Sequence, residues 1–170
     1  MPFADQAFTW CPRCGARGLR RLRAGLLSCP ACGLEYFTNV ASAVVAVLQD
    51  AAGRILLTRR EKDPGKGLLD LPGGFVDPGE SAETALRREL REELGLEVGG
   101  TSWLGSEPNE YEYKGITYRT LDLFFRCEAA GLESLKPREE ILETLLVLPA
   151  QIPMEQIAFS SIRAMLRKLR

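Results

Sequence analysis

The chain has 170 residues, of which 45% are hydrophobic and 26% charged, proportions typical of a globular protein and not of a disordered or coiled-coil one. Its net charge of -1 gives no overall attraction to nucleic acids or anionic membranes, no apolar run reaches the roughly 20 residues of a membrane span, and no signal sequence is evident. We therefore expect a cytoplasmic protein without membrane contact. Because histidine is absent, carboxylates and thiolates must supply any metal ligands or acid–base groups.

Four of the five cysteines lie in two CxxC motifs, CPRCG at 11–15 and CPACG at 29–33. Two such motifs can aim four sulfurs at one point, and the glycine after each permits the left-handed backbone that the turn requires. A disulfide pair is typical of secreted chains, and a redox CxxC needs no second copy at this spacing. The spacing therefore predicts a ribbon over residues 1–37 with a structural Zn²⁺ site, closed to water, made by Cys11, Cys14, Cys29 and Cys32.

The segment between the two CxxC motifs is basic. Arg17, Arg20, Arg21 and Arg23 are compatible with a nucleic-acid-binding ribbon or with a solvated hairpin. Because no aromatic side chain is interleaved with these arginines to stack a base, we favour the solvated hairpin. RNA is thus a partner that the sequence permits but does not favour.

After the ribbon, the pattern predicts a mixed α/β domain over residues 38–170. A β-branched run at 41–50 and a second at 54–60 indicate a hairpin, and the glycine-rich loop after it leads to a helix over 82–94. Ser81 is the expected N-cap and Gly95 the C-cap of that helix. A second hairpin turns at Lys114-Gly115, a strand follows at 145–149, and apolar spacing predicts a helix over 154–170. The apolar face of this last helix is expected to pack on the sheet or on a second copy. Cys127 is expected to be a small buried residue.

The helix over 82–94 carries acids on its apolar face. At about 100° per residue, Glu93 lies about 20° and Glu89 about 60° from Leu86, whereas Glu92 lies about 120° round and Arg88 faces solvent. Carboxylates that point toward an interior repel one another and lose hydration unless a cation compensates them. Oxygen ligands alone suit hard Mg²⁺ or Mn²⁺. The alternative is surface lacing by i,i+4 pairs such as Arg88 with Glu92.

The spacing of the whole segment distinguishes these readings. Gly74, five residues, Glu80, seven residues, Arg88-Glu89-Leu90, one residue, Glu92-Glu93, one residue and Gly95-Leu96 match the Nudix box at every specified position. From about Asn39 to its end, the chain therefore resembles the Nudix hydrolases. The resemblance implies an α/β/α sandwich with a mixed sheet, in which the box binds Mg²⁺ or Mn²⁺ and directs water onto the diphosphate of a nucleoside diphosphate derivative.

The resemblance also implies roles for individual residues. Glu89, Glu92 and Glu93 match the metal-binding glutamates, the Gly74 carbonyl matches a backbone ligand, and Glu80 matches an auxiliary acid. Arg88 is similar to the arginine that holds the glutamates in place. For the general base we choose Glu140 first; the alternatives are Glu139, Glu143, Glu110 and Glu112.

A Cys₄ ribbon directly before such a domain resembles the branch of the family that includes the NADH pyrophosphatases, which cut NADH or NAD-capped RNA, and Glu35-Tyr36-Phe37 fits the join. The sequence departs from that branch in lacking a large domain before the ribbon and in carrying SWLGSEPNEYEYKG where the branch has SQPWPFPxS. ADP-ribose, dinucleotides and nucleotide sugars therefore stay open as substrates beside NADH. The aromatic residues of this region are candidates to stack a base or simply to pack: Trp103, Tyr111, Tyr113 and Tyr118.

Two functions of different classes are compatible with these features. The first is a metal-dependent diphosphate hydrolase; the second is a non-catalytic nucleotide- or nucleic-acid-binding module that uses the basic ribbon. All three box glutamates are present, which a binding module would not need, so we favour the hydrolase. Dimerisation is common among relatives, and a homodimer is among the expectations.

Overall fold

The computed structural model describes residues 1–138 and 140–170. It divides into two compact units. Unit 1 consists of Met1–Ala41 and Glu110–Arg119, and unit 2 of Ser42–Asn109 and Thr120–Arg170. Glu139, one of the alternative general bases, lies outside the described residues.

Unit 1 is built on a small antiparallel sheet with the strand order β1-β2-β3. The strands are β1 (Arg20–Arg23), β2 (Leu26–Ser28) and β3 (Glu35–Phe37), and a short helix α1 (Ala4–Ala7) precedes them. Leu26 and Leu27 of β2 are buried, as are the sulfur-bearing Cys11 and Cys29. A core of this size supplies little hydrophobic stabilisation, so unit 1 needs another source of stability.

A buried carboxylate joins three separate segments of unit 1. Asp5 is 2% exposed. Its Oδ2 accepts hydrogen bonds from Arg21 Nε at 2.9 Å and from the Gly25 amide at 3.0 Å, and its Oδ1 accepts one from Arg119 Nη1 at 3.2 Å. Burial alone would raise the pKa of Asp5, but the Gly25 N–H and the two arginines outweigh it and lower the pKa. Asp5 is therefore ionised and paired, and it ties α1 and the ribbon hairpin to the tip at 110–119.

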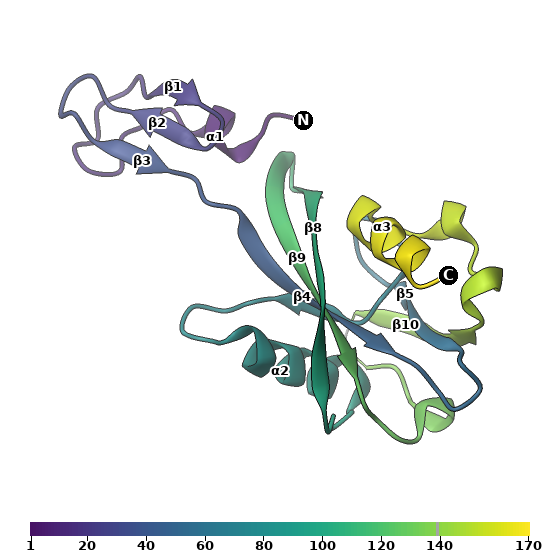
Figure 1. Ribbon diagram of the computed structural model, residues 1–170. Coiled ribbons are helices and arrows are strands. Elements are labelled where there is room, and N and C mark those ends of the chain that lie inside the picture. Colours follow the sequence, from purple (N-terminus) through teal and green to yellow (C-terminus); the bar gives the residue numbers. More distant parts are fainter. Residues whose placement is uncertain (139) are drawn as a thin grey trace. The chain divides into compact units, whose positions relative to one another are not determined.

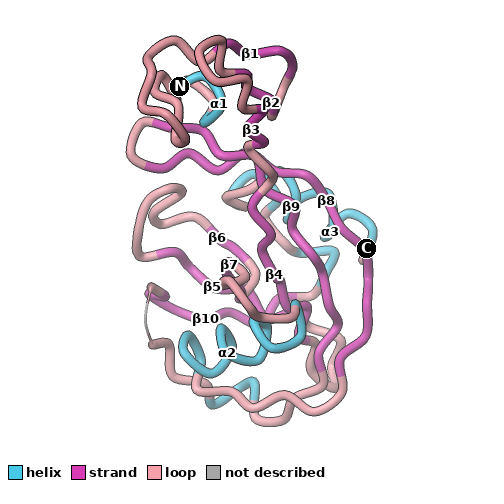
Figure 2. Tube along the Cα trace, turned by 90° about the vertical axis from the view of Figure 1, so that its left-hand side faces the viewer, coloured by secondary structure: helices cyan, strands magenta, loops and turns pink. Residues whose placement is uncertain are grey.

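Unit 2 contains strands of two sheets. One sheet has the strand order β7-β4-β9-β8 and the other the order β10-β5-β6. In Figure 2 the strands of the second sheet lie from top to bottom in the order β6, β5, β10. Strands β4 and β7 are antiparallel, and β5 pairs antiparallel with both β10 and β6. The strands are β4 (Ala41–Leu48), β5 (Ile55–Arg60), β6 (Leu69–Asp70), β7 (Gly73–Phe75), β8 (Thr101–Tyr113), β9 (Ile116–Cys127) and β10 (Ile141–Val147).

The strands separate two apolar layers. Val44, Ala46 and Leu48 of β4 pack with the buried face of helix α2 (Ala82–Leu94), whereas Val45 and Val47 pack with helix α3 (Ser160–Lys168). Successive side chains of a strand point to opposite faces, so one continuous apolar strand can serve both layers. The two helices lie on opposite sides of the strands in Figure 1. This α/β/α arrangement confirms the fold class expected from the sequence.

The expected ends of helix α2 are confirmed. Ser81 caps α2 by accepting a hydrogen bond from the Thr84 amide at 3.2 Å. Gly95 takes the left-handed conformation at φ 62°, and its N–H reaches the Arg91 carbonyl at 2.9 Å. The cap residues and the helix-forming run between them were therefore sufficient to place α2.

The last helix is shorter than expected. Instead of running from residue 154, α3 begins at Ser160, and Met154–Gln156 form a 3₁₀ turn. Ile157 makes a parallel bridge with Leu69, and the Ala158 N–H donates to the Leu69 carbonyl at 2.8 Å. Backbone groups that pair with β6 cannot also form helical hydrogen bonds. The apolar face of α3, Ile162, Met165 and Leu166, packs on the strands as expected.

Two further expectations concern strands. The strand expected at 145–149 is β10, which begins earlier, at Ile141, and ends at Val147 before the 3₁₀ helix Pro149–Gln151. The turn at Lys114-Gly115 is confirmed, with both residues at positive φ, 47° and 84°. Cys127 is buried at the end of β9, as expected. Among the described residues, no helix is long and apolar enough to cross a membrane.

Gly73 is a position where no side chain fits. Its φ is +145°, and a Cβ there would lie 2.1 Å from the Val44 carbonyl oxygen of β4. Gly73→Ala should therefore lower the free energy of unfolding by about 3 kcal/mol or more, because backbone must move to relieve the overlap. Urea denaturation measures this. The matched variant Gly79→Ala, at φ +90° with nothing within 4 Å of the added Cβ, should cost only about 1 kcal/mol. Equal losses in the two variants would contradict the steric argument.

Candidate functional site

The box residues lie on β7, on helix α2 and on the loop that joins them. The loop closes through Asp77 and Glu80: the Glu80 amide donates to the Asp77 carbonyl at 3.0 Å, and the Asp77 amide donates to Glu80 Oε2 at 3.1 Å. The loop thereby brings the backbone of Gly73 and Gly74 beside the buried face of α2, where Glu89 and Glu93 lie. Residues up to twenty positions apart in the sequence are thus collected in one place.

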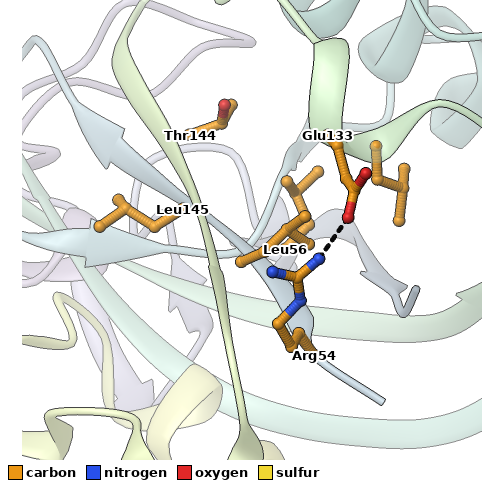
Figure 3. A pocket seen from close by; sticks show the side chains of 7 residues that line it. Arg54, Leu56, Glu133, Thr144 and Leu145 are labelled. Carbon is orange, nitrogen blue, oxygen red and sulfur yellow. Dashed lines mark hydrogen bonds and ion pairs between the residues drawn. The ribbon is translucent and has the colours of Figure 1, made fainter. Parts of the chain in front are cut away.

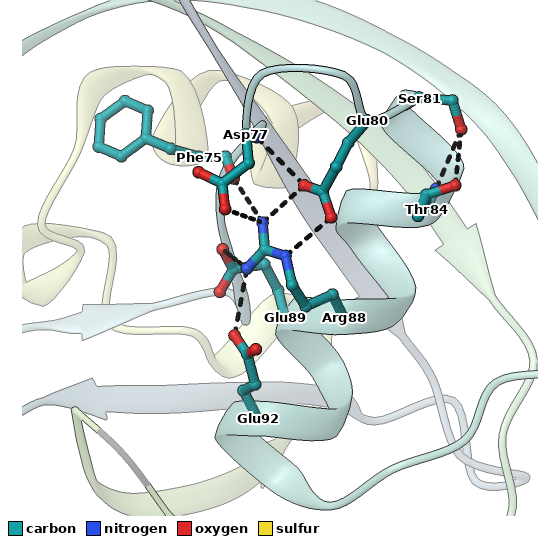
Figure 4. A network of polar contacts seen from close by, with 8 residues as sticks. All are labelled: Phe75, Asp77, Glu80, Ser81, Thr84, Arg88, Glu89 and Glu92. Carbon is teal, nitrogen blue, oxygen red and sulfur yellow. Dashed lines mark hydrogen bonds and ion pairs between the residues drawn. The ribbon is translucent and has the colours of Figure 1, made fainter.

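Arg88 is the centre of a carboxylate network, drawn in Figure 4. Its guanidinium donates to both oxygens of Glu80, from Nε at 2.9 Å and from Nη2 at 2.8 Å. Nη1 donates to Glu89 Oε1 at 2.9 Å and to Glu92 Oε2 at 3.1 Å, and Nη2 also reaches the Phe75 carbonyl at 3.0 Å. The expectation that Arg88 faces solvent is therefore wrong: its side chain is only 25% exposed, because it folds back over the helix onto the loop. One arginine fixes the orientation of three glutamates.

Glu89 lies against the Gly74 backbone. A Cβ on Gly74 would lie 2.4 Å from Glu89 Oε1, so only glycine allows the carboxylate and the main chain to approach this closely. Burial raises the pKa of Glu89, although the Arg88 guanidinium opposes this shift. The carboxylate and the Gly74 backbone together offer the kind of oxygen donors that a hard cation prefers.

Glu93 is the most deeply placed of the box glutamates. Its Oε2 accepts a hydrogen bond from the Gly73 amide at 2.9 Å. Burial raises its pKa well above the ordinary value, and the nearby carboxylates of Glu89 and Asp70 raise it further, while the Gly73 N–H and the Arg60 charge oppose the shift. A buried carboxylate with a raised pKa is stabilised in its charged form when a cation binds beside it.

The residues fit a Mg²⁺ or Mn²⁺ ion that keeps several waters better than an ion whose ligands all come from the protein. Within the described part of the chain, only the four cysteines bring three or more ligating atoms within 4.8 Å of one another, and the glutamates are not gathered that closely. Mg²⁺ usually keeps several waters and takes only one or two carboxylates from the protein, the remaining positions going to substrate phosphates. Glu89, Glu92, Glu93 and the Gly74 carbonyl offer only oxygen atoms, the ligand type that hard Mg²⁺ or Mn²⁺ prefers, and because they are not gathered closely, one or two of the carboxylates could bind an ion directly while the others contact its waters.

A buried ion pair that the sequence analysis missed lies beside Glu93. Arg60 Nη1 donates to Asp70 Oδ2 at 2.8 Å, Arg60 Nε donates to the Pro64 carbonyl at 2.7 Å, and the guanidinium lies 4.9 Å from the Phe159 ring centroid. Burial raises the pKa of Asp70 to about 6 despite the opposing charge of Arg60. Nothing in the local sequence links the two residues, since Arg60 lies in the charged run at 59–63 and Asp70 ends β6; the β5–β6 pairing brings them together.

The general-base candidates fall into two groups. Glu140 precedes β10 with φ +63°, and its Oε1 accepts a hydrogen bond from Lys62 Nζ at 3.0 Å, with both side chains more than half exposed. Glu143 on β10 pairs with Arg59 Nε at 2.6 Å. Glu110 and Glu112, in contrast, belong to unit 1. Among the general-base candidates that the structure describes, Glu140 is the one with a left-handed backbone, which is uncommon for a residue other than glycine.

In unit 1, the four predicted zinc ligands are together. The Sγ atoms of Cys11 and Cys32 are 3.7 Å apart, as are those of Cys14 and Cys29. Zinc–sulfur bonds of about 2.3 Å at tetrahedral angles require sulfurs about 3.8 Å apart. The two turns also have the same backbone pattern: the Gly15 amide donates to the Cys11 carbonyl and the Gly33 amide to the Cys29 carbonyl, both at 2.9 Å, with φ near +70° at each glycine. The cluster is consistent with a zinc ribbon.

A shallow pocket elsewhere in unit 2 contains none of the candidate site residues. It is lined by leucines of β5, β10 and the 3₁₀ turn Leu132–Ser134, and the Arg54–Glu133 ion pair at 2.5 Å lies at it (Figure 3). It offers one ion pair and an apolar wall, and it lacks the convergent acids of the box.

Comparison with known proteins assigns the family. A model of the NUDIX domain matches residues 39–169, and the chain therefore belongs to the Nudix family. Among solved structures, the fold is similar to a NUDIX hydrolase from Nitrosomonas europaea, with a TM-score of 0.63 and 23% identity over 94% of this chain and 89% of that one. It is also similar to MutT NUDIX hydrolase from Burkholderia pseudomallei, with a TM-score of 0.64 and 24% identity over 78% of this chain and 99% of that one.

The curated relatives have names that specify a substrate, unlike the solved structures above. The chain is 28% identical over 162 residues to the NAD-capped RNA hydrolase NudC of Stutzerimonas stutzeri (strain A1501) and 30% identical over 162 residues to that of Pseudomonas aeruginosa (strain LESB58). Both alignments cover 88% of this chain but only 56% and 55% of the relatives. The chain thus spans about half the length of the curated relatives it matches.

The contacts of Arg88 drawn in Figure 4 lead us to predict the effect of replacing it. Arg88→Lys should lower the free energy of unfolding by about 2–4 kcal/mol, because a single ammonium cannot replace the paired bonds to Glu80 and also hold Glu89 and Glu92. Apparent Mg²⁺ affinity should fall about 10–100-fold as the glutamates lose their orientation. The control is Arg91→Lys, whose exposed pair with Glu97 should contribute no more than about 0.5 kcal/mol. Thermal denaturation and metal titration together test this, and similar behaviour of the two variants would remove the special role of Arg88.

Proposed function

We propose that this protein is a hydrolase that cleaves the diphosphate linkage of a nucleoside diphosphate derivative at a divalent metal held by the box. The observation that carries the proposal is the contact of Glu89 with the Gly74 backbone, beside the buried Glu93 and the Glu92 carboxylate fixed by Arg88. Partly buried carboxylates that repel one another are costly to the fold, and binding of a cation is what would compensate that cost.

In this proposal each residue has a separate task. Glu89, Glu92, Glu93 and the Gly74 carbonyl hold Mg²⁺ or Mn²⁺, and Arg88 with Glu80 keeps the carboxylates oriented. When bound, such an ion neutralises diphosphate charge and lowers the pKa of bound water. The Gly73 N–H holds Glu93 in place by a hydrogen bond, and the Arg60–Asp70 ion pair lies beside Glu93 and supports its position.

The first candidate substrates are NAD-type dinucleotides and NAD-capped RNA. The support is the match of 88% of this chain to relatives named NAD-capped RNA hydrolases. ADP-ribose and nucleotide sugars belong in the same test because they carry the same diphosphate. Purified protein is incubated with each compound and Mg²⁺ or Mn²⁺, and the products are separated by chromatography. Cleavage of none of these compounds with either metal would refute the hydrolase.

We propose Glu140 as the general base. Its left-handed backbone costs free energy in a non-glycine residue, a cost of the kind often found at functional positions. Glu140→Gln should reduce kcat about 10²–10³-fold while the Mg²⁺ dependence stays unchanged, because the change removes a proton acceptor and not a ligand. Rates measured against metal concentration decide between these roles. The matched variant Glu143→Gln removes the acid paired with Arg59 and should leave kcat within about twofold; the reverse result would move the role to Glu143.

We also propose that Cys11, Cys14, Cys29 and Cys32 bind one structural Zn²⁺, that the ribbon spans 1–37 and the Nudix domain 38–170, and that the protein acts in the cytoplasm. Free cysteines that serve as metal ligands suit a reducing compartment. A homodimer stays a prediction, which light scattering after gel filtration tests.

A further inference from the structure

The ribbon has exposed aromatic and basic side chains that the box chemistry does not use. Trp10 is 61% exposed and Phe8 46% exposed, both in the segment just before the first CxxC motif. Every residue of β1 is exposed, including Arg20 and Arg23. Large exposed aromatic side chains beside cations mark interaction surfaces more often than scattered apolar residues do.

Trp10 lies beside the basic segment although seven positions separate it from Arg17 in the sequence. Trp10 and Arg17 form an antiparallel bridge, and the Gly18 amide donates to the Thr9 carbonyl at 2.8 Å. The Arg17 guanidinium carbon lies 5.9 Å from the Trp10 ring centroid. The aromatic partner that the sequence analysis found lacking between the arginines is thus supplied from the far side of the CxxC turn.

Four of the five arginines of the ribbon are not neutralised by the protein. Arg21 is paired with the buried Asp5, but within residues 1–138 and 140–170 no carboxylate forms an ion pair with Arg13, Arg17, Arg20 or Arg23. Unit 1 contains seven basic and four acidic residues, a net charge of +3, whereas unit 2 contains fifteen and nineteen, a net charge of -4. Even with about -2 from a zinc bound by four thiolates, unit 1 stays positive. The overall net charge of -1 therefore conceals a positive unit.

We propose that Trp10, Arg17, Arg20 and Arg23, here called the ribbon surface, bind single-stranded nucleic acid. An indole ring offers a face on which an unpaired base stacks, and arginines spaced along a strand can follow the phosphate backbone. A duplex presents no unpaired base faces, so it should bind more weakly. The residues of the ribbon surface lie outside the box, so binding can be tested without hydrolysis, although one candidate substrate of the box, NAD-capped RNA, would carry the same kind of strand.

Binding is measured on the 170-residue, zinc-loaded chain carrying Glu92→Gln, so that hydrolysis does not interfere. The probe is a fluorescently labelled twelve-nucleotide oligouridylate with a 5′-monophosphate, followed by anisotropy at 50 mM salt. Trp10→Ala should weaken binding about tenfold, and Trp10→Phe, which retains a ring, should weaken it less. Arg17→Ala and Arg20→Ala should each weaken it and reduce the salt dependence by about 0.7 in the slope of log K against log salt. Arg167→Ala, which removes an exposed arginine on α3, is the matched control and should bind like the parent.

A second readout tests stacking directly. The chain contains two tryptophans, Trp10 and Trp103. In a Trp103→Phe variant, Trp10 is the one tryptophan left, and oligouridylate should quench its emission; in a Trp10→Phe variant, the emission of Trp103 should not change. No anisotropy change up to about 100 µM protein, or equal affinities of the parent and Trp10→Ala, would overturn the proposal. Tighter binding of a duplex than of the single strand would also overturn it. Hydrolysis of the diphosphate compounds is measured separately on the unaltered chain. Failure of the binding proposal is therefore distinguishable from failure of the hydrolase proposal.

Discussion

Glu93→Gln should abolish metal-dependent hydrolysis and leave the fold intact or more stable. The change removes a ligand charge without changing side-chain size, and loss of about 4 kcal/mol of transition-state stabilisation corresponds to a decrease of about 10³-fold in kcat/KM. Without metal, burial and the nearby carboxylates of Glu89 and Asp70 raise the pKa of Glu93, because both disfavour its charged form. Neutralising it should raise the free energy of unfolding by roughly 1 kcal/mol or more.

The raised pKa of Glu93 fixes how the effect of this substitution on stability changes with pH. A carboxyl whose pKa is higher in the folded than in the unfolded protein lowers stability as pH rises from its unfolded pKa through its folded pKa. The gain from Glu93→Gln should therefore be absent at pH values well below the unfolded pKa and should grow as the pH rises from there toward the raised folded pKa. Chemical denaturation without metal at several pH values measures it. The exposed Glu83, in the first turn of the same helix, provides the control: Glu83→Gln should change neither activity nor the pH profile. Full activity of Glu93→Gln would refute the assigned ligand role.

Removal of zinc should unfold unit 1 while unit 2 keeps its structure. Structural zinc in small domains contributes about 10–16 kcal/mol, more than a core of this size can replace. Cys29→Ser should therefore reduce zinc content to well below one equivalent and abolish hydrogen-exchange protection in 1–41. The strands and α2 of unit 2 should keep their protection, because their two apolar layers contain none of the four ligands.

Cys127→Ser is the matched control for zinc. Cys127 is buried in β9 and has no part in the cluster, so the variant should lose only about 1–3 kcal/mol from burying a hydroxyl and should retain one zinc. Elemental analysis of both variants, purified without chelator, distinguishes them. A Cys29→Ser protein that retains one equivalent of zinc, or an unaltered chain without zinc, would contradict the prediction.

Features encoded by local spacing were predictable. The caps and length of α2 followed from Ser81, Gly95 and the helix formers between them, and the four sulfurs meet as the duplicated CxxC spacing requires. Both depend on residues only a few positions apart, or on a repeated turn, so short-range geometry decides them. The roles of the box residues came from a fixed pattern of nine positions and not from any single residue.

Features created by tertiary pairing were not predictable. The segment 154–159 has helical apolar spacing, yet its backbone pairs with Leu69, and pairing between distant segments overrides periodicity. The same holds for Arg88, whose position on the helix suggested solvent but whose long side chain reaches the loop. Trp10 and Arg17 are neighbours through an isolated bridge, and Arg60 and Asp70 through the β5–β6 pairing, and neither neighbourhood follows from periodicity.

The carboxylate of Asp5 has a consequence for the order in which the chain can be completed. One of its two arginine partners, Arg119, is synthesised more than a hundred residues later, at the end of the hairpin tip. When only the first 41 residues have left the ribosome, the four cysteines of the cluster have been made but Arg119 has not. Asp5 must then remain hydrated or keep Arg21 alone, since a buried carboxylate with part of its partners missing is costly. The ribbon can therefore capture metal early in synthesis, but its final form depends on translation of β9.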